Sequence, residues 1–329
     1  MIIDMHTHFT PEKLPEMRNL AGSNLWPIME MTSEQTGNVL ISGKVFRKLT
    51  NQSWDANRRI EDMDKEGIDI QVISPMPELL SYWFEPEDTL EFSRYINDKL
   101  SELVQVNPKR FYGLGMVPLQ DPQLAARELK RLKKDFNLIG VEVGSNVNGR
   151  PIGDPYFHPF FEAAEEEGMA IFVHPLHPLG KERLIGPMQL QAYINFPFET
   201  GWAGASLITG GVLEKYPNLR IALSHGGGSL FSILPRLEHG WKTNESLKAL
   251  MKKSPMEYGK KLYFDTLVYD ELTLRHLINL IGTSNLLIGS DYPYLIREKS
   301  PGNRVKMLNL TEEVEKSIFK ANSLKFLGI

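Results

Sequence analysis

Short apolar segments recur along the chain and alternate with longer amphipathic ones. Eight of the short segments are rich in Ile, Val and Leu, and they run as continuous apolar stretches, which is typical of parallel strands covered on both faces. The predicted strands are Ile2–His8, Ile68–Ser74, Phe111–Pro118, Leu138–Gly144, Ala170–Pro175, Arg220–His225, Leu262–Leu267 and Leu286–Asp291.

The intervals between these strands carry helical patterns. Leu, Ala and Phe return at helical spacing in Asp121–Phe136 and in Pro155–Glu167. Eight alternations of strand and helix favour an α/β fold of the closed (β/α)8 type, a TIM barrel, over an open doubly wound sheet. Because such barrels often exceed about 200 residues as one unit, we expect residues 1–329 to form a single domain.

One interval is longer than a plain strand–helix connection needs. About 45 residues separate the first strand from the helix expected near Asp55–Glu66. Within it, Asn38–Leu49 has a Ser-Gly turn between two short β-like runs, which predicts a small β-hairpin. We therefore expect an insertion over about residues 14–50 after the first strand.

Composition and charge exclude several classes of protein. The chain has 37 basic and 41 acidic side chains, a net charge of -4, which argues against a general nucleic-acid binder. No apolar run approaches the roughly 18 residues of a membrane helix, so no membrane partner is expected. The opening MIIDMHTHF lacks the basic and then apolar pattern of a signal peptide, and we expect a cytoplasmic protein.

The chain contains eight histidines and no cysteine. Disulfides, thiolate nucleophiles and zinc fingers are therefore excluded, and any metal must be held by His, Asp or Glu. In a barrel the catalytic groups lie at the C-terminal ends of the strands. Five candidate ligands stand there in the predicted fold: His6, His8, His174, His225 and Asp291.

These residue types point to one divalent metal ion. Imidazole and carboxylate ligands suit zinc best, with manganese, iron and cobalt as alternatives. Three histidines and Asp291 would leave room for a water molecule whose pKa the cation lowers towards neutrality. Five ligands exceed that need, so His225 is interpreted as the acid/base. The glycines Gly226–Gly228 that follow it allow close approach of the backbone to a substrate.

A second metal would need a bridging ligand on the fourth strand. That strand has no lysine, and only Glu142 could serve. The alternative interpretation of Glu142 is a polar residue that forms hydrogen bonds near the barrel mouth. We expect a single metal.

The motifs His6-x-His8, FVHP at His174, SHGGG at His225 and GSDYP at Asp291 resemble those of the amidohydrolase superfamily. The further segments GKVFR, SYWFEPEDTL, RFYGLGMVPLQ and GGVLEKYPNLR resemble one branch of it. That branch contains α-amino-β-carboxymuconate-ε-semialdehyde decarboxylase and related metal-dependent non-oxidative decarboxylases. The resemblance covers nearly the whole chain.

The resemblance implies a carbon–carbon lyase with zinc held by His6, His8, His174 and Asp291. His225 would be the acid/base that protonates the carbon losing CO2 from an unsaturated or aromatic acid. The best candidate substrate is α-amino-β-carboxymuconate-ε-semialdehyde or a close analogue. A metal-dependent hydrolase or hydratase uses the same ligands and is the alternative. Carboxylate-binding arginines and the absence of an obvious dinuclear bridge favour decarboxylation.

The resemblance also implies substrate-binding residues. An arginine at the position of Arg47 holds the substrate carboxylate, and one at the position of Arg236 reaches in from the neighbouring subunit of a homodimer with a shared site. Without the resemblance, both would be interpreted as surface ion-pairing residues. Tyr82 and Trp83 could stack on a flat substrate or pack the loop on the barrel, and Tyr294 could line the same pocket.

Four histidines remain outside the predicted site, and some segments differ from those of the semialdehyde decarboxylases. His177 lies in the loop over the site, and its contact with substrate stays open, whereas His158, His239 and His276 are interpreted as structural. The semialdehyde decarboxylases carry Trp-Asp where this chain has Leu176-His177, and no tryptophan follows before Trp202. A second partner-supplied arginine is not matched, because Asn244 stands near its place. These departures lie where the substrate binds in the family, so they favour a pocket for a different acid of the same class.

Overall fold

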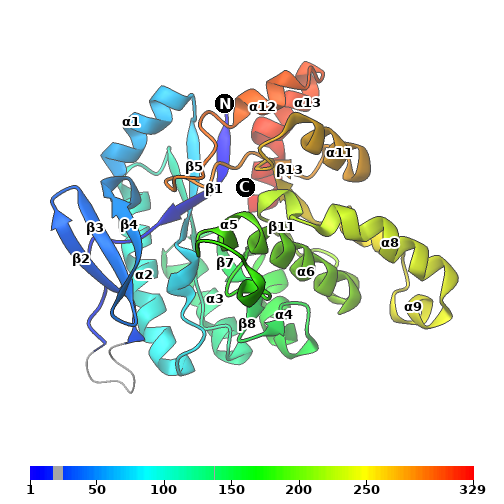
Figure 1. The fold of residues 1–329 in the computed structure, drawn as a ribbon, viewed down its shortest axis with the longest axis horizontal. Coiled ribbons are helices and arrows are strands. Elements are labelled where there is room, and N and C mark those ends of the chain that lie inside the picture. The colour runs from blue at the N-terminus through cyan, green and yellow to red at the C-terminus, as the bar shows by residue number, and fades with distance from the viewer. Residues whose placement is uncertain (18–24, 137) are drawn as a thin grey trace.

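The computed structural model describes residues 1–17, 25–136 and 138–329. Eight parallel strands form one sheet whose spatial order is the order of the chain (Figure 1). They are β1 (Ile3–Phe9), β5 (Ile70–Pro75), β6 (Phe111–Gly115), β7 (Gly140–Gly144), β10 (Ala170–His174), β11 (Ile221–Leu223), β12 (Tyr263–Asp265) and β13 (Leu286–Leu287).

The last strand returns to the first and closes the sheet. Parallel bridges join Asp4 to Ile288 and Thr7 to Tyr292. The Met5 amide donates a hydrogen bond to the Ile288 carbonyl at 2.7 Å. A sheet of eight parallel strands in chain order that closes on itself is a (β/α)8 barrel, so the predicted fold class is confirmed.

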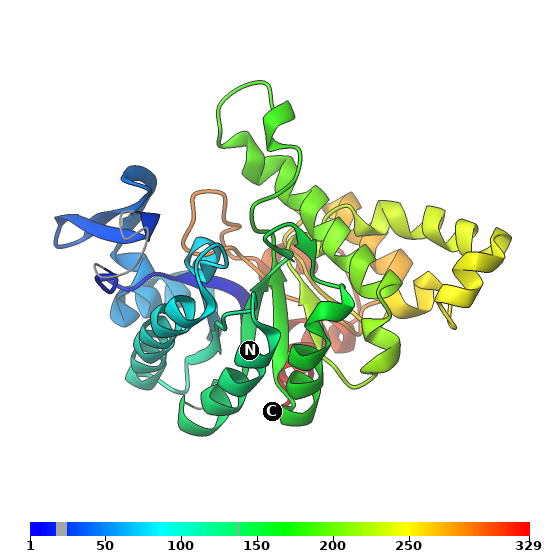
Figure 2. The same cartoon turned by 90° about the horizontal axis from the view of Figure 1, so that it is seen from below.

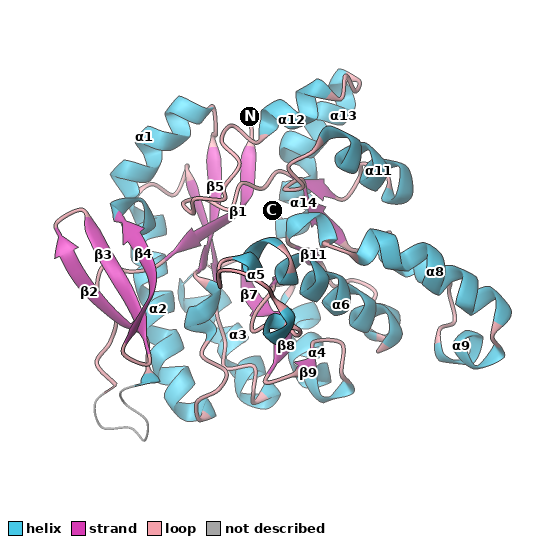
Figure 3. Ribbon diagram, viewed as in Figure 1, coloured by secondary structure: helices cyan, strands magenta, loops and turns pink. Residues whose placement is uncertain are grey.

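Helices surround the barrel and cover the outer face of its strands (Figure 3). The longer ones follow successive barrel strands, as the helical patterns in the sequence indicate, and shorter helices fill the connections. They are α1 (Ala56–Glu66), α2 (Pro86–Val106), α3 (Pro122–Phe136), α4 (His158–Glu167), α5 (Leu190–Tyr193), α6 (Asn195–Thr209), α7 (Val212–Lys215), α8 (Leu230–Thr243), α9 (Glu245–Leu250), α10 (Pro255–Gly259), α11 (Glu271–Ile281), α12 (Gly302–Met307), α13 (Glu312–Lys316) and α14 (Asn322–Leu327). In the part of the chain that is described, no helix combines the length and apolar character needed to cross a membrane.

The inside of the barrel is a packed apolar core below the site. Four fully buried side chains from four different strands belong to one apolar cluster: Met5, Val72, Leu114 and Phe172. Side chains that point the other way from the same strands pack against the helices, so every barrel strand is covered on both faces. This double burial explains why the strands read as continuous apolar runs in the sequence.

The insertion after β1 is a small antiparallel sheet beside the barrel (Figure 1). The expected hairpin over Asn38–Leu49 is confirmed as β3 (Thr36–Ile41) and β4 (Lys44–Thr50), and a third strand, β2 (Ile28–Ser33), pairs with β3. The hairpin turns at Ser42 and Gly43, whose φ angles of 53° and 70° match a tight turn of the type that suits twisted strands. Residues 18–24 of the expected insertion lie outside the described residues.

Two further parts project from the barrel. Residues 176–202, here called the overhang, include α5 and the start of α6 and stand clear of the strands in Figure 2. The buried carboxylate of Glu199 anchors the overhang, since it accepts hydrogen bonds from Asn146 Nδ2 at 2.8 Å and from the Leu179 amide at 3.2 Å. The second projection is the pair α8 and α9, which extends outward in Figure 1. A short antiparallel pair, β8 (Asn146–Val147) and β9 (Arg150–Pro151), follows β7.

Candidate active site

A bulge in β1 aims the first two candidate ligands into the barrel. The pairing of β1 with β5 shifts register between Asp4 and Thr7. Met5 below the shift belongs to the inner core, and His6 directly after it also points inward, with its ring 4.9 Å from that of Phe172. Strict alternation would have sent these two neighbours to opposite faces. His6 and His8 do share a face, as the sequence predicted, and the bulge selects which face it is.

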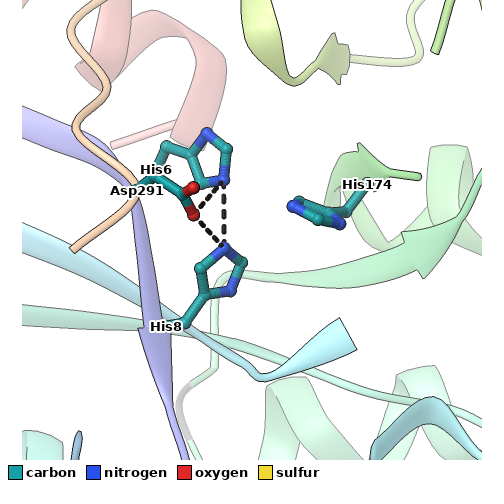
Figure 4. Close-up of side chains that lie close together, drawn as sticks. All are labelled: His6, His8, His174 and Asp291. Atoms are coloured by element: carbon teal, nitrogen blue, oxygen red, sulfur yellow. Dashed lines mark hydrogen bonds and ion pairs between the residues drawn. The ribbon is translucent and has the colours of Figure 1, made fainter. Parts of the chain in front are cut away.

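Four side chains meet at the mouth of the barrel (Figure 4). His6, His8, His174 and Asp291 are all buried, and each offers one ligand atom that lies within 4.8 Å of the others. These four residues, here called the ligand cluster, are the four predicted metal ligands. Asp291 lies four residues beyond the end of β13 and not on the strand, with a φ of 65°, and its amide donates to the His6 carbonyl at 2.8 Å.

Each histidine of the ligand cluster uses its Nδ1 in a hydrogen bond. His6 Nδ1 lies 2.7 Å from the carboxylate of Asp265, and His8 Nδ1 lies 3.2 Å from the Pro75 carbonyl. His174 Nδ1 lies 3.0 Å from the carbonyl of the next residue. These acceptors hold the proton on Nδ1, so the three Nε2 atoms keep their lone pairs free for a metal.

The ligand atoms of His6, His8 and Asp291 face each other. His6 Nε2 lies 3.0 Å from His8 Nε2, and Asp291 Oδ1 lies 3.1 Å from His8 Nε2 and 3.5 Å from His6 Nε2 (Figure 4). Asp291 Oδ1 is buried and has no hydrogen-bond partner among the described residues. Nitrogen and oxygen donor atoms that converge at a buried point fit a divalent metal.

Protonation states in the cluster agree with metal binding. Burial lowers the pKa of His8 to about 4, and burial together with the neighbouring histidines lowers that of His174 well below its ordinary value. Burial opposes ionisation of Asp291, but His8 and His6 lower its pKa to about 2. Burial would also favour neutral His6, but its bond to Asp265 raises its pKa to about 9. A metal at Nε2 would displace that proton.

Asp265 is a functional residue that the sequence reasoning missed. Besides holding His6, its carboxylate accepts the amides of His225 at 2.9 Å and Gly226 at 2.7 Å. It therefore positions one metal ligand and the predicted acid/base at once. The signal was available, because Asp265 ends β12 just as His174 ends β10.

His225 lies two residues beyond the end of β11, in a turn that glycines make possible. His225 has a φ of 55°, and the glycines from Gly226 to Gly228 have φ angles of 61°, 78° and 56°. A Cβ at Gly228 would lie 2.0 Å from the Pro197 carbonyl oxygen. The glycines thus serve the turn and its packing against neighbouring backbone.

The His225 ring faces the ligand cluster. Its centroid is 5.2 Å from those of His6 and of His174, and its Nδ1 is 3.2 Å from the hydroxyl of Ser224. Desolvation and the neighbouring His6 lower the pKa of His225 to about 4. His225 is therefore neutral near pH 7 and can accept a proton.

A cavity of about 260 Å³ lies above the ligand cluster. His174, His225 and Asp291 line it on the metal side. This volume suits a small conjugated molecule. The other lining includes the aromatic rings of Phe196 and Phe231 and the polar side chains of Arg47, Glu78 and Tyr294.

Arg47, Glu78 and Tyr294 form what we call the arginine corner. Arg47 comes from β4 of the insertion, and its guanidinium lies 4.1 Å above the Tyr294 ring and 3.7 Å from Glu78 Oε1. Tyr294 in turn stacks on His8, with ring centroids 5.0 Å apart. The predicted positions of Arg47 and Tyr294 beside the cavity thus agree with the structure. Glu78, in the 3-10 turn Pro77–Leu80, carried no sequence signal.

Three predicted substrate-binding residues lie outside the cavity in this chain. Tyr82 is buried with its hydroxyl 3.3 Å from the Gly144 amide, which corresponds to the packing interpretation. Trp83 packs on His177 with ring centroids 4.6 Å apart, and neither lines the cavity. Arg236 is exposed on α8 and does not line it either.

The other titratable candidates have structural contacts. Glu142 on β7 accepts a hydrogen bond from the Ser74 hydroxyl at 2.5 Å and lies 3.6 Å from His8 Nδ1, and burial raises its pKa to about 8. It therefore lies beside the ligand cluster without joining it. His158 packs near Tyr216, His239 is exposed on α8, and His276 packs against Phe231.

Comparison with known proteins decides the family. The amidohydrolase family profile matches residues 3–329. The chain belongs to the amidohydrolase family. It is 36% identical to 2-amino-3-carboxymuconate-6-semialdehyde decarboxylase of Dictyostelium discoideum over 99% of this chain and 91% of that one.

Solved structures agree with this assignment. The crystal structure of 5-carboxyvanillate decarboxylase from Sphingomonas paucimobilis is 28% identical, covers 83% of this chain and 82% of its own, and superposes with a TM-score of 0.76. The fold is also shared with a dihydroxybenzoic acid decarboxylase of Polaromonas sp. solved with manganese and 2-nitroresorcinol, at 24% identity, coverage of 99% and 96%, and a TM-score of 0.77. The protein is thus a metal-dependent decarboxylase of the carboxy-lyase class, as the sequence predicted.

Proposed function

We propose that this enzyme removes a carboxylate from 2-amino-3-carboxymuconate-6-semialdehyde, which is α-amino-β-carboxymuconate-ε-semialdehyde, or from a close analogue. The observation that carries the proposal is that the same small cavity is lined by metal ligands, by the neutral His225 and by Arg47. The relative of that name from Dictyostelium discoideum, similar over 99% of the chain, supports the choice of substrate.

His6, His8, His174 and Asp291 would hold one divalent cation. Zinc is the proposed metal because nitrogen and oxygen donors in a buried four-ligand set suit it, and manganese is the alternative found in a structural neighbour. When bound, the cation supplies a Lewis acid that stabilises negative charge developing on the substrate. Asp265 and the two backbone carbonyls hold the histidine rings in the orientation this requires.

His225 is the proposed acid/base. It is neutral near pH 7 and faces the cavity, so it can take up a proton and deliver it to the carbon that bears the carboxylate. The new carbon–hydrogen bond replaces the carbon–carboxylate bond, and the electron pair of the broken bond returns to the conjugated system as CO2 leaves. Phe196 and Phe231 line the cavity and exclude water from this carbon.

Arg47 binds a substrate carboxylate through its planar fork of donors. One chain, however, offers little net positive charge to a diacid. The charges of a divalent cation and Arg47 are balanced by those of Asp265, Asp291 and Glu78. A further cation is therefore needed, and we assign that role to Arg236 of the partner subunit in a homodimer.

The overhang supports a dimer. It exposes large apolar side chains, among them Ile185, Met188 and Trp202, which are 96%, 77% and 64% exposed. Arg236 lies exposed on the projecting α8, where a second subunit can bring it to another cavity. If the site is shared, mixing inactive Arg236→Ala and inactive His225→Ala subunits should restore part of the activity. No recovery under proven subunit exchange would contradict a shared site.

The activity is tested by product analysis. Protein stripped of metal and refilled with zinc or manganese should release CO2 from the semialdehyde substrate, with 2,6-dihydroxybenzoate as the aromatic comparison. Unfilled protein is the control and should be inactive. Hydrolysis without CO2 across a panel of lactones and amides would instead establish the hydrolase alternative.

A further inference from the structure

The arginine corner has polar atoms that the protein itself does not satisfy. Among the described residues, no hydrogen-bond partner reaches Arg47 Nε, Glu78 Oε2 or the Tyr294 hydroxyl, although all three atoms are buried. The contact of Arg47 with Glu78, at 3.7 Å, is longer than a hydrogen bond. Buried polar groups are normally paired, so unpaired ones beside a cavity indicate a group that arrives with the ligand.

The contacts of Arg47 fix the orientation of its guanidinium and still allow it to bind a substrate acid. The Tyr294 ring covers one face of the guanidinium at 4.1 Å, and the negative charge of Glu78 lies beside it. Arg47 therefore keeps its orientation before any acid binds, and it lines the cavity.

Glu78 creates a conflict for an ordinary carboxylate. An acid bound at Arg47 would bring a second negative charge next to Glu78, and like charges in a desolvated cavity repel strongly. A hydroxyl or amino group on the neighbouring carbon removes this conflict, because it donates a hydrogen bond to Glu78 while its carboxylate binds Arg47.

We propose that Glu78 is a specificity-determining residue, which selects acids that carry a hydroxyl or amino donor next to the carboxylate bound by Arg47. The inference rests on the proposed function, because it assumes that an acid binds beside Arg47. It adds the chemical class of the neighbouring substituent and the residue that recognises it.

Equilibrium binding to zinc-loaded protein tests this proposal without turnover. The probes are 2-hydroxybenzoate and 2-methoxybenzoate, in which the donor is blocked, each measured by isothermal titration calorimetry. The unsubstituted enzyme should bind the hydroxy acid about tenfold more tightly than the methoxy acid, because only the former donates to Glu78.

Two variants assign the selectivity to Glu78. Glu78→Met removes the acceptor and should reduce the tenfold preference to about twofold or less, whereas Glu78→Gln keeps a neutral acceptor and should retain about threefold. Glu128→Gln is the matched control, since Glu128 is a buried carboxylate paired with Arg94 and Arg131 outside the cavity. Glu128→Gln should leave the preference for the hydroxy acid over the methoxy acid unchanged.

The outcomes separate this proposal from the proposed function. A preference for the hydroxy acid that survives both Glu78 substitutions would place the hydroxyl at the metal and overturn the role of Glu78. Equal affinities of the unsubstituted enzyme for the two acids would overturn it even if neither variant folds. Binding that follows Glu78 in a protein that releases no CO2 from the semialdehyde would refute the proposed substrate and leave the selectivity standing.

Discussion

The ligand cluster and the arginine corner share one cavity but are built in opposite ways. The cluster comes from barrel strands and their ends, and each histidine has an acceptor for its Nδ1 proton. The arginine corner comes from the insertion and from loops, and three of its buried polar atoms have no hydrogen-bond partner among the described residues. A metal site has to be rigid before the ion arrives, whereas a site for an organic acid can leave its last hydrogen bonds to the substrate.

The largest expected effect concerns His225, which faces the cluster without belonging to it. His225→Ala should lower kcat by about a hundred- to ten-thousandfold, because the proton donor to the reacting carbon is lost. Metal content, measured by mass spectrometry of the dialysed protein, should stay near one ion per chain. His239→Ala, on the exposed part of α8, is the matched control. Loss of the metal together with activity would show that His225 is a metal ligand and therefore belongs to the ligand cluster.

Asp265 tests whether the rigidity of the cluster depends on its hydrogen bonds. Asp265→Asn should weaken zinc binding by about ten- to a hundredfold, because the amide is a poorer acceptor for the His6 Nδ1 proton. A competition titration with a fluorescent chelator measures this. Asp270→Asn makes the same change at an exposed helix cap and should leave zinc affinity unaltered. Equal zinc affinity in both variants would show that packing alone orients His6.

Arg47 tests the other region. Arg47→Lys should raise KM about tenfold and leave kcat within about threefold, because a point charge replaces a fork that binds carboxylate with two bonds. Steady-state kinetics on metal-loaded protein separate the two constants. Arg58→Lys on the outside of α1, where Arg58 pairs with Glu61, is the control. A fall in kcat with constant KM would mean that Arg47 acts only in the transition state.

The smallest effect is expected at Tyr294. Tyr294→Phe removes a buried hydroxyl that has no partner in the described part of the chain and keeps the ring between Arg47 and His8, so the free energy of unfolding should rise by about 1 kcal/mol. Chemical denaturation of the metal-loaded variant measures the change. A decrease instead would show that the hydroxyl is satisfied in the folded protein, and the contrast between the two regions would be weaker.

The fold and the ligand cluster were accessible from the sequence for a physical reason. Barrel strands are apolar throughout, so a histidine or aspartate at a strand end is conspicuous, and all four ligands stood out in this way. The same criterion applied to the end of β12 would have found Asp265. The bulge in β1 was not accessible, because no residue type marks it.

The loops were harder to interpret. The position of Tyr82 after the second strand suggested contact with substrate, but the turn over Pro77–Leu80 and the φ of 54° at Ser81 direct it into the protein. Glu78 looked like any loop carboxylate. Glu78 matters because it lies beside Arg47, which is 31 positions earlier in the chain and stands on β4 of the insertion, outside the barrel sheet. Pairings of this kind depend on tertiary geometry and leave no local pattern.

The bulge in β1 divides the interior of the barrel into two compartments with different chemistry. Below the bulge lies the apolar inner core around Met5 and Phe172, here called the floor. Above it lies the polar part of the interior, here called the chamber, whose first residue on β1 is His6. The floor can therefore be repacked for thermal tolerance while the chamber is left alone. The shared border sets one limit on such redesign: a single-residue deletion in β1 would rotate both histidines out of the chamber while leaving the floor's volume almost unchanged.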